Sequence, residues 1–301
     1  NKNEKLMTTE VANMIIEKID RILNDNIFEG INIHYFGGEP LLNIPVLIYL
    51  DENIKKITDK IGIVYKAFLT TNGSMLSKEL LQKVKFSSIQ LTFDGLEKTH
   101  DRLRVSDHFH FKEEIELIEN IMNFSQAKVL LRTNICKENK DEIIALHKYI
   151  FEKFGNERIE INPNRTIKYH QDDSFEMLSV QEYAEVAYQI KLLWSEQKGK
   201  FELPVPRSTP CKFPYGNAYA ISPEGYCTFC SGSMDQEKKY FFDVDIENKK
   251  MFSVRKECKK CNILPLCLGG CIIQYNLRAG ACTYEKYELK NILISYIKHI
   301  S

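Results

Sequence analysis

The chain has 301 residues, of which 44% are hydrophobic and 27% charged, an ordinary globular composition that excludes a disordered or fibrous protein. Its 41 basic and 41 acidic residues cancel, so no overall charge favours nucleic acid or an anionic membrane as a partner. No apolar run approaches the roughly 18 to 20 residues that span a bilayer, and the N-terminus does not resemble a signal peptide. We therefore expect a cytoplasmic protein without a nucleic-acid or membrane partner.

Helical and strand patterns alternate from residue 7 to about 170. The first helix follows Thr8 or Thr9 and carries Val11, Ile15 and Ile19 at helical spacing. Strands are predicted over 31–36, 61–70, 88–93, 129–135 and 158–162, and further helices over 43–57, 76–84, 111–123 and 139–153. Repeated strand–helix units predict an α/β fold with a parallel sheet.

The alternation ends after one more predicted helix, over 179–197. This helix opens with a capping box made by Ser179 and Glu182. A proline-rich stretch at 203–214 then leads into a region of different character. We expect three parts: an α/β domain, a bridging helix with its linker, and a cysteine-rich domain, over 1–170, 171–206 and 207–301.

Polar and glycine-rich segments lie at the carboxyl ends of four of the predicted strands. These segments are Gly37-Gly38-Glu39-Pro40, Thr70-Thr71-Asn72-Gly73, Thr92-Phe93-Asp94-Gly95 and Arg132-Thr133-Asn134. Ligands of parallel α/β folds bind at the carboxyl ends of strands, so these segments are candidates for one binding site. Arg132 shares a strand face with Asn134, and its guanidinium there needs an anion. A ligand carboxylate and a salt bridge to Glu39 or Asp94 both satisfy that need.

Eight of the nine cysteines lie after residue 210. Without a secretion signal these thiols are expected to be reduced, which favours metal binding over disulfides. Structural zinc and an iron–sulfur cluster both use such thiolates, although seven patterned cysteines exceed the needs of one four-thiolate site. A turn at Ser222-Pro223-Glu224-Gly225 predicts a hairpin that returns Cys230 beside Cys211.

The four strand-end segments, in this order and spacing, resemble the S-adenosylmethionine (SAM) site of the radical SAM superfamily. The resemblance implies a (β/α)6 TIM-like barrel in which Gly37, Gly38 and Glu39 hold the methionine amino group of SAM. It assigns the methionine carboxylate to Thr92 and Arg132. The remaining residues expected around the same cofactor are Asn72, Asp94 and Asn134.

The cysteine pattern resembles that of the SPASM domains that extend peptide-modifying radical SAM enzymes. By that resemblance two auxiliary [4Fe-4S] clusters are expected. One takes Cys258, Cys261, Cys267 and Cys282, and the other takes Cys211, Cys230 and Cys271 without an obvious fourth ligand. Cys227 lies three residues before Cys230, so in a regular strand the two would face opposite sides. We therefore expect an open iron position on the second cluster.

The sequence departs from the family in two places. It contains no CxxxCxxC motif, the loop that binds the catalytic cluster, so the catalytic residues are unknown and we expect this loop and the first barrel strand to precede Asn1. Ser231 stands where sulfatase-maturating relatives have an aspartate that acts as the catalytic base. A hydroxyl does not replace a carboxylate base without an activating partner.

The resemblance implies a maturase that uses a 5′-deoxyadenosyl radical to take hydrogen from a ribosomally made precursor peptide. We expect it to form a thioether or carbon–carbon cross-link, with flavodoxin or ferredoxin as the external electron donor. Two alternatives remain. One is an anaerobic sulfatase-maturating enzyme that forms formylglycine, and the other is a non-catalytic, zinc- or cluster-bound scaffold that binds peptides.

Overall fold

The computed structural model describes most residues of the α/β region and part of the cysteine-rich region. The described residues are 5–104, 106, 109–155, 157–168, 175–208, 211, 218–228, 239–243, 254–271 and 282–300. Cys230 and Ser231 lie outside these ranges. The predictions made for those two residues are therefore not tested by the structure.

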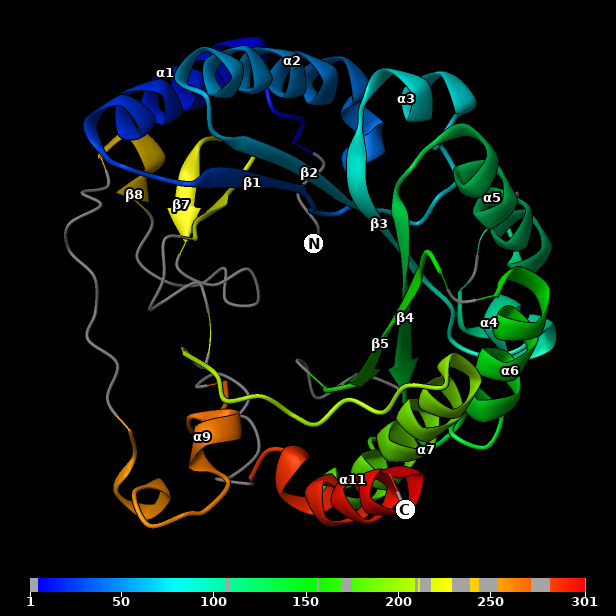
Figure 1. Cartoon of the computed structure of the whole chain (residues 1–301). Helices are drawn as coiled ribbons and strands as arrows, with labels where there is room; N and C mark the ends of the chain where they lie inside the picture. Colours follow the sequence, from blue (N-terminus) through cyan, green and yellow to red (C-terminus); the bar gives the residue numbers. More distant parts are fainter. Residues whose placement is uncertain are drawn as a thin grey trace.

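Five parallel strands form a sheet in the order in which they occur in the chain. They are β1 (Gly30–Tyr35), β2 (Val64–Thr70), β3 (Phe86–Thr92), β4 (Lys128–Ile135) and β5 (Ile159–Arg165). The sheet curves, and its helices cover the convex side (Figure 1). This arrangement confirms the predicted α/β class and the partial TIM-like barrel.

Helix α1 (Thr9–Asp25) precedes β1, and helical segments on the outside of the sheet join each strand to the next. The joining segments are η1 (Pro40–Asn43), α2 (Ile44–Ile61), α3 (Lys78–Lys83), α4 (Glu97–Leu103), α5 (Phe111–Phe124) and α6 (Ile143–Phe154). The Thr8 side chain caps α1 by accepting a hydrogen bond from the Val11 amide at 3.3 Å. The sequence did not predict α4, because its seven residues, EKTHDRL, show no apolar periodicity.

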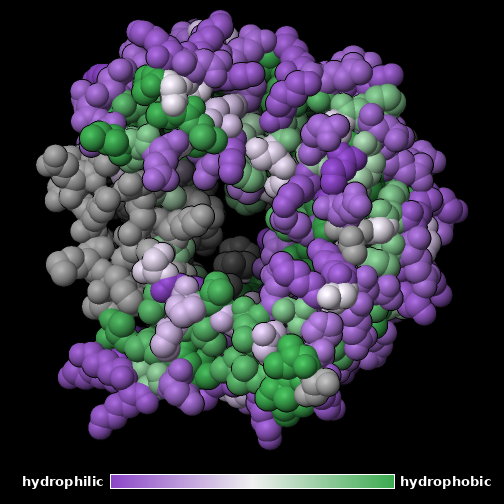
Figure 2. Space-filling model, in the orientation of Figure 1, coloured by the Kyte–Doolittle hydropathy of each residue, from purple (hydrophilic) through white to green (hydrophobic). Residues whose placement is uncertain are grey.

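The two faces of the sheet differ in polarity. On β4 the residues Val129, Leu131 and Ile135 are buried against the helices, whereas Arg132 and Asn134 on the other face are partly exposed. The concave face therefore carries polar side chains next to the hollow at the centre of the molecule (Figure 2). The main hydrophobic core lies between the convex face and the helices.

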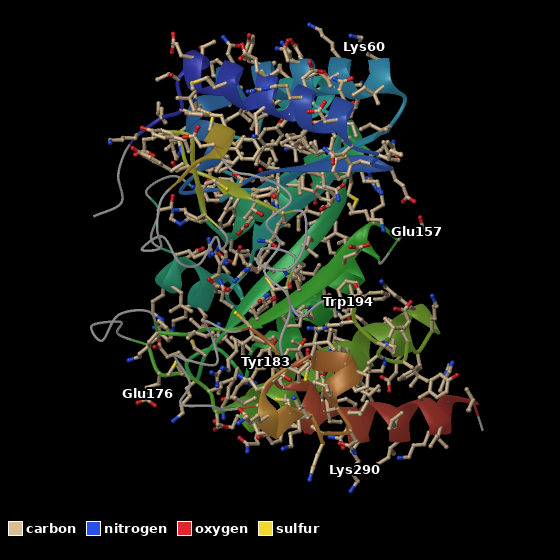
Figure 3. The ribbon with its side chains drawn as sticks, turned by 90° about the vertical axis from the view of Figure 1, so that its left-hand side faces the viewer. Lys60, Glu157, Glu176, Tyr183, Trp194 and Lys290 are labelled. Atoms are coloured by element: carbon tan, nitrogen blue, oxygen red, sulfur yellow. The ribbon has the colours of Figure 1, made fainter. Side chains whose placement is uncertain are left out.

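Two long helices follow the sheet and pack against each other. They are α7 (Val180–Lys198) and the C-terminal α11 (Glu285–Ile300). The predicted capping box at the start of α7 is confirmed, with Ser179 and Glu182 each bonding the backbone of the other. Tyr183 and Trp194 of α7 point into the body of the protein, while Lys290 lies on the outside of α11 (Figure 3). No helix of the described segments is both long and apolar enough to cross a membrane.

A small antiparallel sheet packs against the first helix of the barrel. Its strands are β6 (Ala220–Ile221), β7 (Tyr226–Thr228) and β8 (Lys239–Tyr240), followed by the short helix η2 (Phe241–Asp243). The predicted turn is present, with the Gly225 amide donating to the Ser222 carbonyl at 2.9 Å. Gly225 has a φ of 85°, a backbone conformation that residues with a side chain rarely adopt.

Two further short helices carry cysteines between this sheet and α11. They are η3 (Lys256–Cys258) and α9 (Leu264–Cys267). Together with α11, which was not predicted from the sequence, they complete the described secondary structure of the C-terminal region.

A buried polar chain fixes β4 to the helices behind it. The Trp194 indole donates to Nδ1 of His147 at 3.0 Å, and Nε2 of His147 bonds the Thr133 hydroxyl at 3.2 Å. Burial lowers the pKa of His147 to about 3, so the ring is neutral and its one proton is on Nε2. The ring thus donates to Thr133 and accepts from Trp194, which satisfies both nitrogens.

The substitution Thr133→Val is expected to lower the free energy of unfolding by about 1–3 kcal/mol, because it leaves the buried His147 Nε2–H without an acceptor. Thr70→Val is the matched control. The Thr70 hydroxyl also bonds a histidine, His34, at 2.8 Å, but that ring is exposed and water can replace the bond. Urea denaturation measures both. Equal effects of the two substitutions would contradict this role of the buried chain.

Candidate functional site

The four strand-end segments lie at one edge of the sheet. Parallel pairing of β1 through β4 requires their carboxyl ends to lie at that edge, and Thr92 is paired in register with Arg132. A Cβ added to Gly37 or Gly38 would meet no atom within 4 Å. The backbone at the end of β1 is therefore accessible to a ligand.

Glu39 joins the ends of β1 and β2. Its Oε1 accepts hydrogen bonds from the Thr71 hydroxyl at 2.7 Å and the Leu41 amide at 3.1 Å. Its Oε2 accepts from the Asn72 amide at 2.7 Å. The carboxylate therefore fixes the local backbone, and Oε2 keeps a lone pair that could accept from an ammonium group.

Asp94 joins the ends of β3 and β4. One carboxylate oxygen accepts from the Asn134 amide at 3.0 Å, and the other accepts from Nε of Arg104 at 2.9 Å. Asn139 adds a bond from its side-chain amide to the Asp94 carbonyl at 2.8 Å. The salt bridge considered for Asp94 is thus made with Arg104 of the turn after α4.

Arg132 and Thr92 lie side by side on the inner face. Nε of Arg132 donates to the Asn134 side chain at 2.9 Å, which orients the guanidinium. Below them, the Asn162 amide donates to the Gln90 side chain at 3.0 Å. The inner face therefore presents a cation, a hydroxyl and several amides in neighbouring positions.

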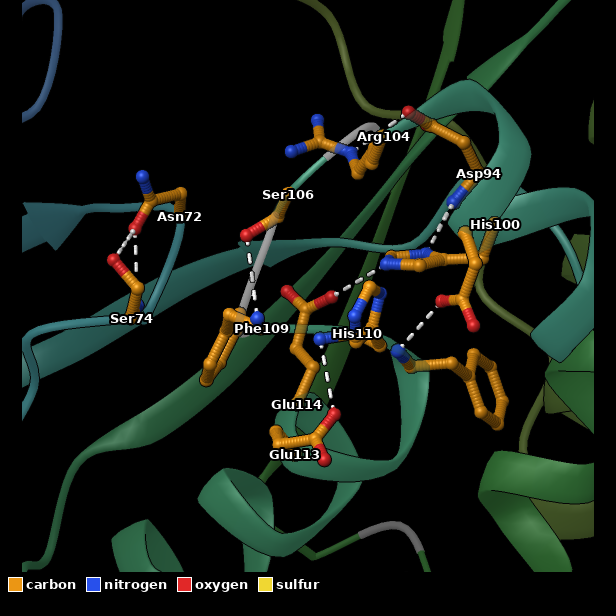
Figure 4. A network of polar contacts seen from close by, with 12 residues as sticks. Asn72, Ser74, Asp94, His100, Arg104, Ser106, Phe109, His110, Glu113 and Glu114 are labelled. Carbon is orange, nitrogen blue, oxygen red and sulfur yellow. Dashed lines mark hydrogen bonds and ion pairs between the residues drawn. The ribbon is translucent and has the colours of Figure 1, made fainter.

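A buried histidine–glutamate pair supports the Asp94 turn from behind (Figure 4). The Asp94 amide donates to Nδ1 of His100 at 3.4 Å, and Nε2 of His100 lies 3.2 Å from Oε2 of Glu114. Burial raises the pKa of the Glu114 carboxyl to about 8. Burial, followed by the Arg104 guanidinium, lowers the pKa of His100 to about 4. Near neutral pH both side chains are therefore mostly uncharged.

Sequence reasoning did not identify this pair. Its signal was an acid on the apolar stripe of α5, since Glu114 is as buried as its neighbours Ile115 and Ile118. Such an acid needs a buried partner or a shifted pKa. Only the fold shows that the partner is His100.

The segment around Gly269 brings two predicted cluster ligands together. The Gly269 amide donates to Sγ of Cys267 at 3.4 Å. A Cβ on Gly269 would lie 4.0 Å from Sγ of Cys258, and its φ of 86° also disfavours a side chain. Cys258 and Cys267 therefore flank the same glycine.

Other contacts bring the segment that contains Cys282 to the same region. A Cβ on Gly270 would lie 2.3 Å from the Thr283 side chain, so the backbone before Cys271 passes directly over the residue after Cys282. Arg207 reinforces this approach. Its amide donates to the Pro265 carbonyl at 2.9 Å and its guanidinium to Glu285 at 2.7 Å.

The contacts around Gly269 and Gly270 do not amount to a formed coordination sphere. Within the described ranges, no group of three or more cysteine, histidine or acidic side chains is placed to hold a metal ion. Cys261 and Cys271 are partly exposed, as is Cys211, the one described ligand of the second predicted set beside Cys271. Among the described ligands, no cysteine forms a disulfide.

Two buried cysteines do not belong to these ligand sets. Cys227 packs with Ile15, Ile19 and Phe241, and burial raises the pKa of its thiol to about 11. Cys136 is also buried, and burial raises its pKa. A buried thiol that resists deprotonation is a poor metal ligand, so neither residue supplies the missing fourth ligand from this position.

Comparisons with known proteins give structural matches only. No family model and no curated protein sequence matches the chain. The structure titled "Native anSMEcpe with bound AdoMet", of an anaerobic sulfatase-maturating enzyme, matches with a TM-score of 0.74 and 15% identity. That match covers 100% of this chain and 93% of the other.

Two further solved structures extend the comparison. The anSMEcpe complex with AdoMet and the Kp18Cys peptide has a TM-score of 0.71 and 18% identity, and covers 98% of this chain and 90% of the other. SuiB of Streptococcus suis bound to S-adenosylmethionine has a TM-score of 0.56 and 17% identity, with 87% and 66% covered. The chain therefore has the fold of these radical SAM enzymes, from the barrel through the cysteine-rich region.

The Glu114 pair makes a pH-dependent contribution to stability. Above about pH 4.5 the unfolded carboxyl loses its proton, whereas the folded one keeps it up to about pH 8. The stability of the native protein relative to Glu114→Gln should therefore fall by about 1 kcal/mol per pH unit between pH 5 and 8.

Chemical denaturation at several pH values measures this difference. His100 is present in both proteins, so its contribution to their difference in stability below pH 6.5 largely cancels. Glu116→Gln, at an exposed position on the same helix, is the matched control for loss of a carboxylate. A difference between the native protein and Glu114→Gln that is independent of pH would show that Glu114 is not a buried neutral acid.

Proposed function

We propose that this chain belongs to a radical SAM enzyme that modifies peptides. The observation that supports this most strongly is the single sheet edge that carries Gly37, Gly38, Thr92 and Arg132, in a fold shared with AdoMet-bound enzymes. The proposal also adopts the three parts expected from the sequence, with the SPASM domain over 207–301.

The residues at the sheet edge fit the methionine part of SAM. The open backbone at Gly37 and Gly38 can accept from the ammonium group through its carbonyl oxygens, beside the remaining lone pair of Glu39 Oε2. Thr92 and Arg132 are adjacent in register and can donate to the carboxylate. Asn72, Asp94 and Asn134 complete the proposed site, with Asp94 holding two strand ends in place.

The cysteine-rich region fits iron–sulfur clusters by its donor set. Cys258, Cys261, Cys267 and Cys282 supply four thiols in segments that the Gly269 and Gly270 contacts bring together. Four thiolates are the usual ligands of a [4Fe-4S] cluster. Cys211, Cys230 and Cys271 are proposed for a second cluster with an open iron position.

When bound to a reduced cluster, SAM supplies a 5′-deoxyadenosyl radical that takes a hydrogen atom from a peptide. The residues of this chain bind and orient the cofactor and exclude water and competing hydrogen donors. The polar inner face, with Gln90 and Asn162, lies below the proposed SAM site and can bind peptide amides. We propose a cytoplasmic location, with flavodoxin or ferredoxin as the electron donor.

We propose thioether or carbon–carbon cross-linking as the particular reaction. Ser231 supports this choice, because the aspartate base of sulfatase maturation is absent at that position. Formylglycine formation is the second candidate, favoured by the match to anSMEcpe, and it would need another base. Ribosomally made precursor peptides are the proposed substrates.

The experiment uses the native-length protein under anaerobic conditions with dithionite and SAM, because the 301 residues contain no CxxxCxxC motif. We expect 5′-deoxyadenosine to form. Arg132→Gln should weaken SAM binding about tenfold to a hundredfold, the equivalent of one lost charge-assisted hydrogen bond.

Arg102→Gln is the matched control, since Arg102 is exposed and pairs with Glu138 on the surface. Calorimetry measures SAM affinity, and chromatography measures 5′-deoxyadenosine. Absence of both SAM binding and 5′-deoxyadenosine in a protein that contains iron would reject the proposal. Equal affinity in both variants would reject the role of Arg132 alone.

A further inference from the structure

Three of the predicted cluster ligands already have N–H donors at their sulfur atoms. Arg255 Nη2 lies 3.7 Å from Sγ of Cys258, and Lys286 Nζ lies 3.7 Å from Sγ of Cys282. The Gly269 amide donates to Sγ of Cys267. Two of the three donors carry a full positive charge.

Arg255 is held in place by the loop that carries the cysteines. The same Nη2 donates to the Gly269 carbonyl at 2.7 Å, and Nε lies 3.5 Å from the Glu257 carboxylate. Its side chain is only 27% exposed. The guanidinium therefore stays next to Cys258 and is screened less than a free surface charge.

Lys286 occupies a different environment. It lies on the exposed side of the first turn of α11, four residues after Cys282. Its long side chain is free to move in water, so its effect on the sulfur is weakened by solvent. Of the two cations, Arg255 should have the larger influence.

Positive charges and N–H donors at cysteine sulfur change the redox balance of a bound cluster. Uptake of one electron adds one negative charge to the cluster and its thiolates, with no bond made or broken. A fixed cation nearby stabilises this more negative state more than the oxidised state. Hydrogen bonds to the sulfurs act in the same direction.

We propose that Arg255, with a smaller contribution from Lys286, raises the reduction potential of the cluster held by Cys258, Cys261, Cys267 and Cys282. The proposal rests on the proposed function, because it requires a cluster at these four cysteines. Arg255 is then a positioning residue that acts through Cys258.

The test is a redox titration of the native-length protein, reconstituted with iron and sulfide and followed by electron paramagnetic resonance. The signal of this cluster is assigned as the one that Cys267→Ala removes. With Arg255→Gln, the reduced fraction at the native midpoint potential should fall from half to about a tenth. That tenfold change in ratio is about 59 mV for one electron.

Three further variants separate the effect of a cation bonded to a cluster sulfur from the general effect of a substitution. Arg255→Lys keeps the charge and should restore much of the potential. Lys259→Gln removes an exposed cation next to Cys258 that makes no bond to a sulfur in the described structure, and should leave the potential nearly unchanged. Lys286→Met should lower the potential by less than Arg255→Gln.

The outcomes distinguish this inference from the proposed function. A native protein that binds no iron overturns both. Normal iron content with an unchanged midpoint in Arg255→Gln overturns the inference alone. If Arg255→Gln loses the cluster, Lys286→Met decides, since its site is exposed, and an unchanged midpoint there overturns the inference.

Discussion

Parallel strand pairing is the constraint on which the proposed site depends. Because β1 to β4 all run in one direction, Gly37, Asn72 and Asp94 follow strands that end at the same edge, and Arg132 of β4 is paired with the last residue of β3. The two carboxylates there act mainly on the backbone: Glu39 joins β1 to β2, and Asp94 joins β3 to β4. The edge is thereby fixed before any ligand binds, which lowers the entropy cost of binding. The neutral His100–Glu114 pair behind Asp94 adds support without adding charge to the site.

The cysteine-rich region is organised differently, by close backbone approaches instead of a sheet. Gly270 allows its backbone to approach Thr283 where a side chain would collide, and Arg207 bonds both Pro265 and Glu285. α11 is held on α7 by the Lys191–Glu288 ion pair at 2.6 Å and by the Tyr188–Ser295 hydrogen bond. Helix α7 in turn contacts β5, so these contacts connect the cysteine region to the last strand of the sheet. The two proposed sites therefore belong to one packed structure.

The sequence predicted those parts of the structure that depend on local pattern. Strand alternation located β1 to β5, and the capping residues Thr8 and Ser179 marked the starts of α1 and α7. Helix α4 was missed because it lacks an apolar period, and α11 was missed although Leu289, Ile292 and Tyr296 recur at helical spacing. The partners of Asp94, Glu114 and Cys258 were also missed, because each contact depends on chain segments that only the fold brings together. A single sequence carries no signal for such pairs beyond an acid in an apolar stripe.

Metal analysis of the 301-residue chain, prepared and reconstituted without oxygen, tests the central claim most directly. The account predicts about eight iron atoms per chain with a matching amount of sulfide, since two four-iron clusters are proposed. Cys267→Ala should remove about half of that iron, whereas Cys227→Ala should remove none, because Cys227 lies in the hydrophobic core. Zinc in place of iron, or a chain that binds no iron, would contradict the account and favour a structural or peptide-binding role.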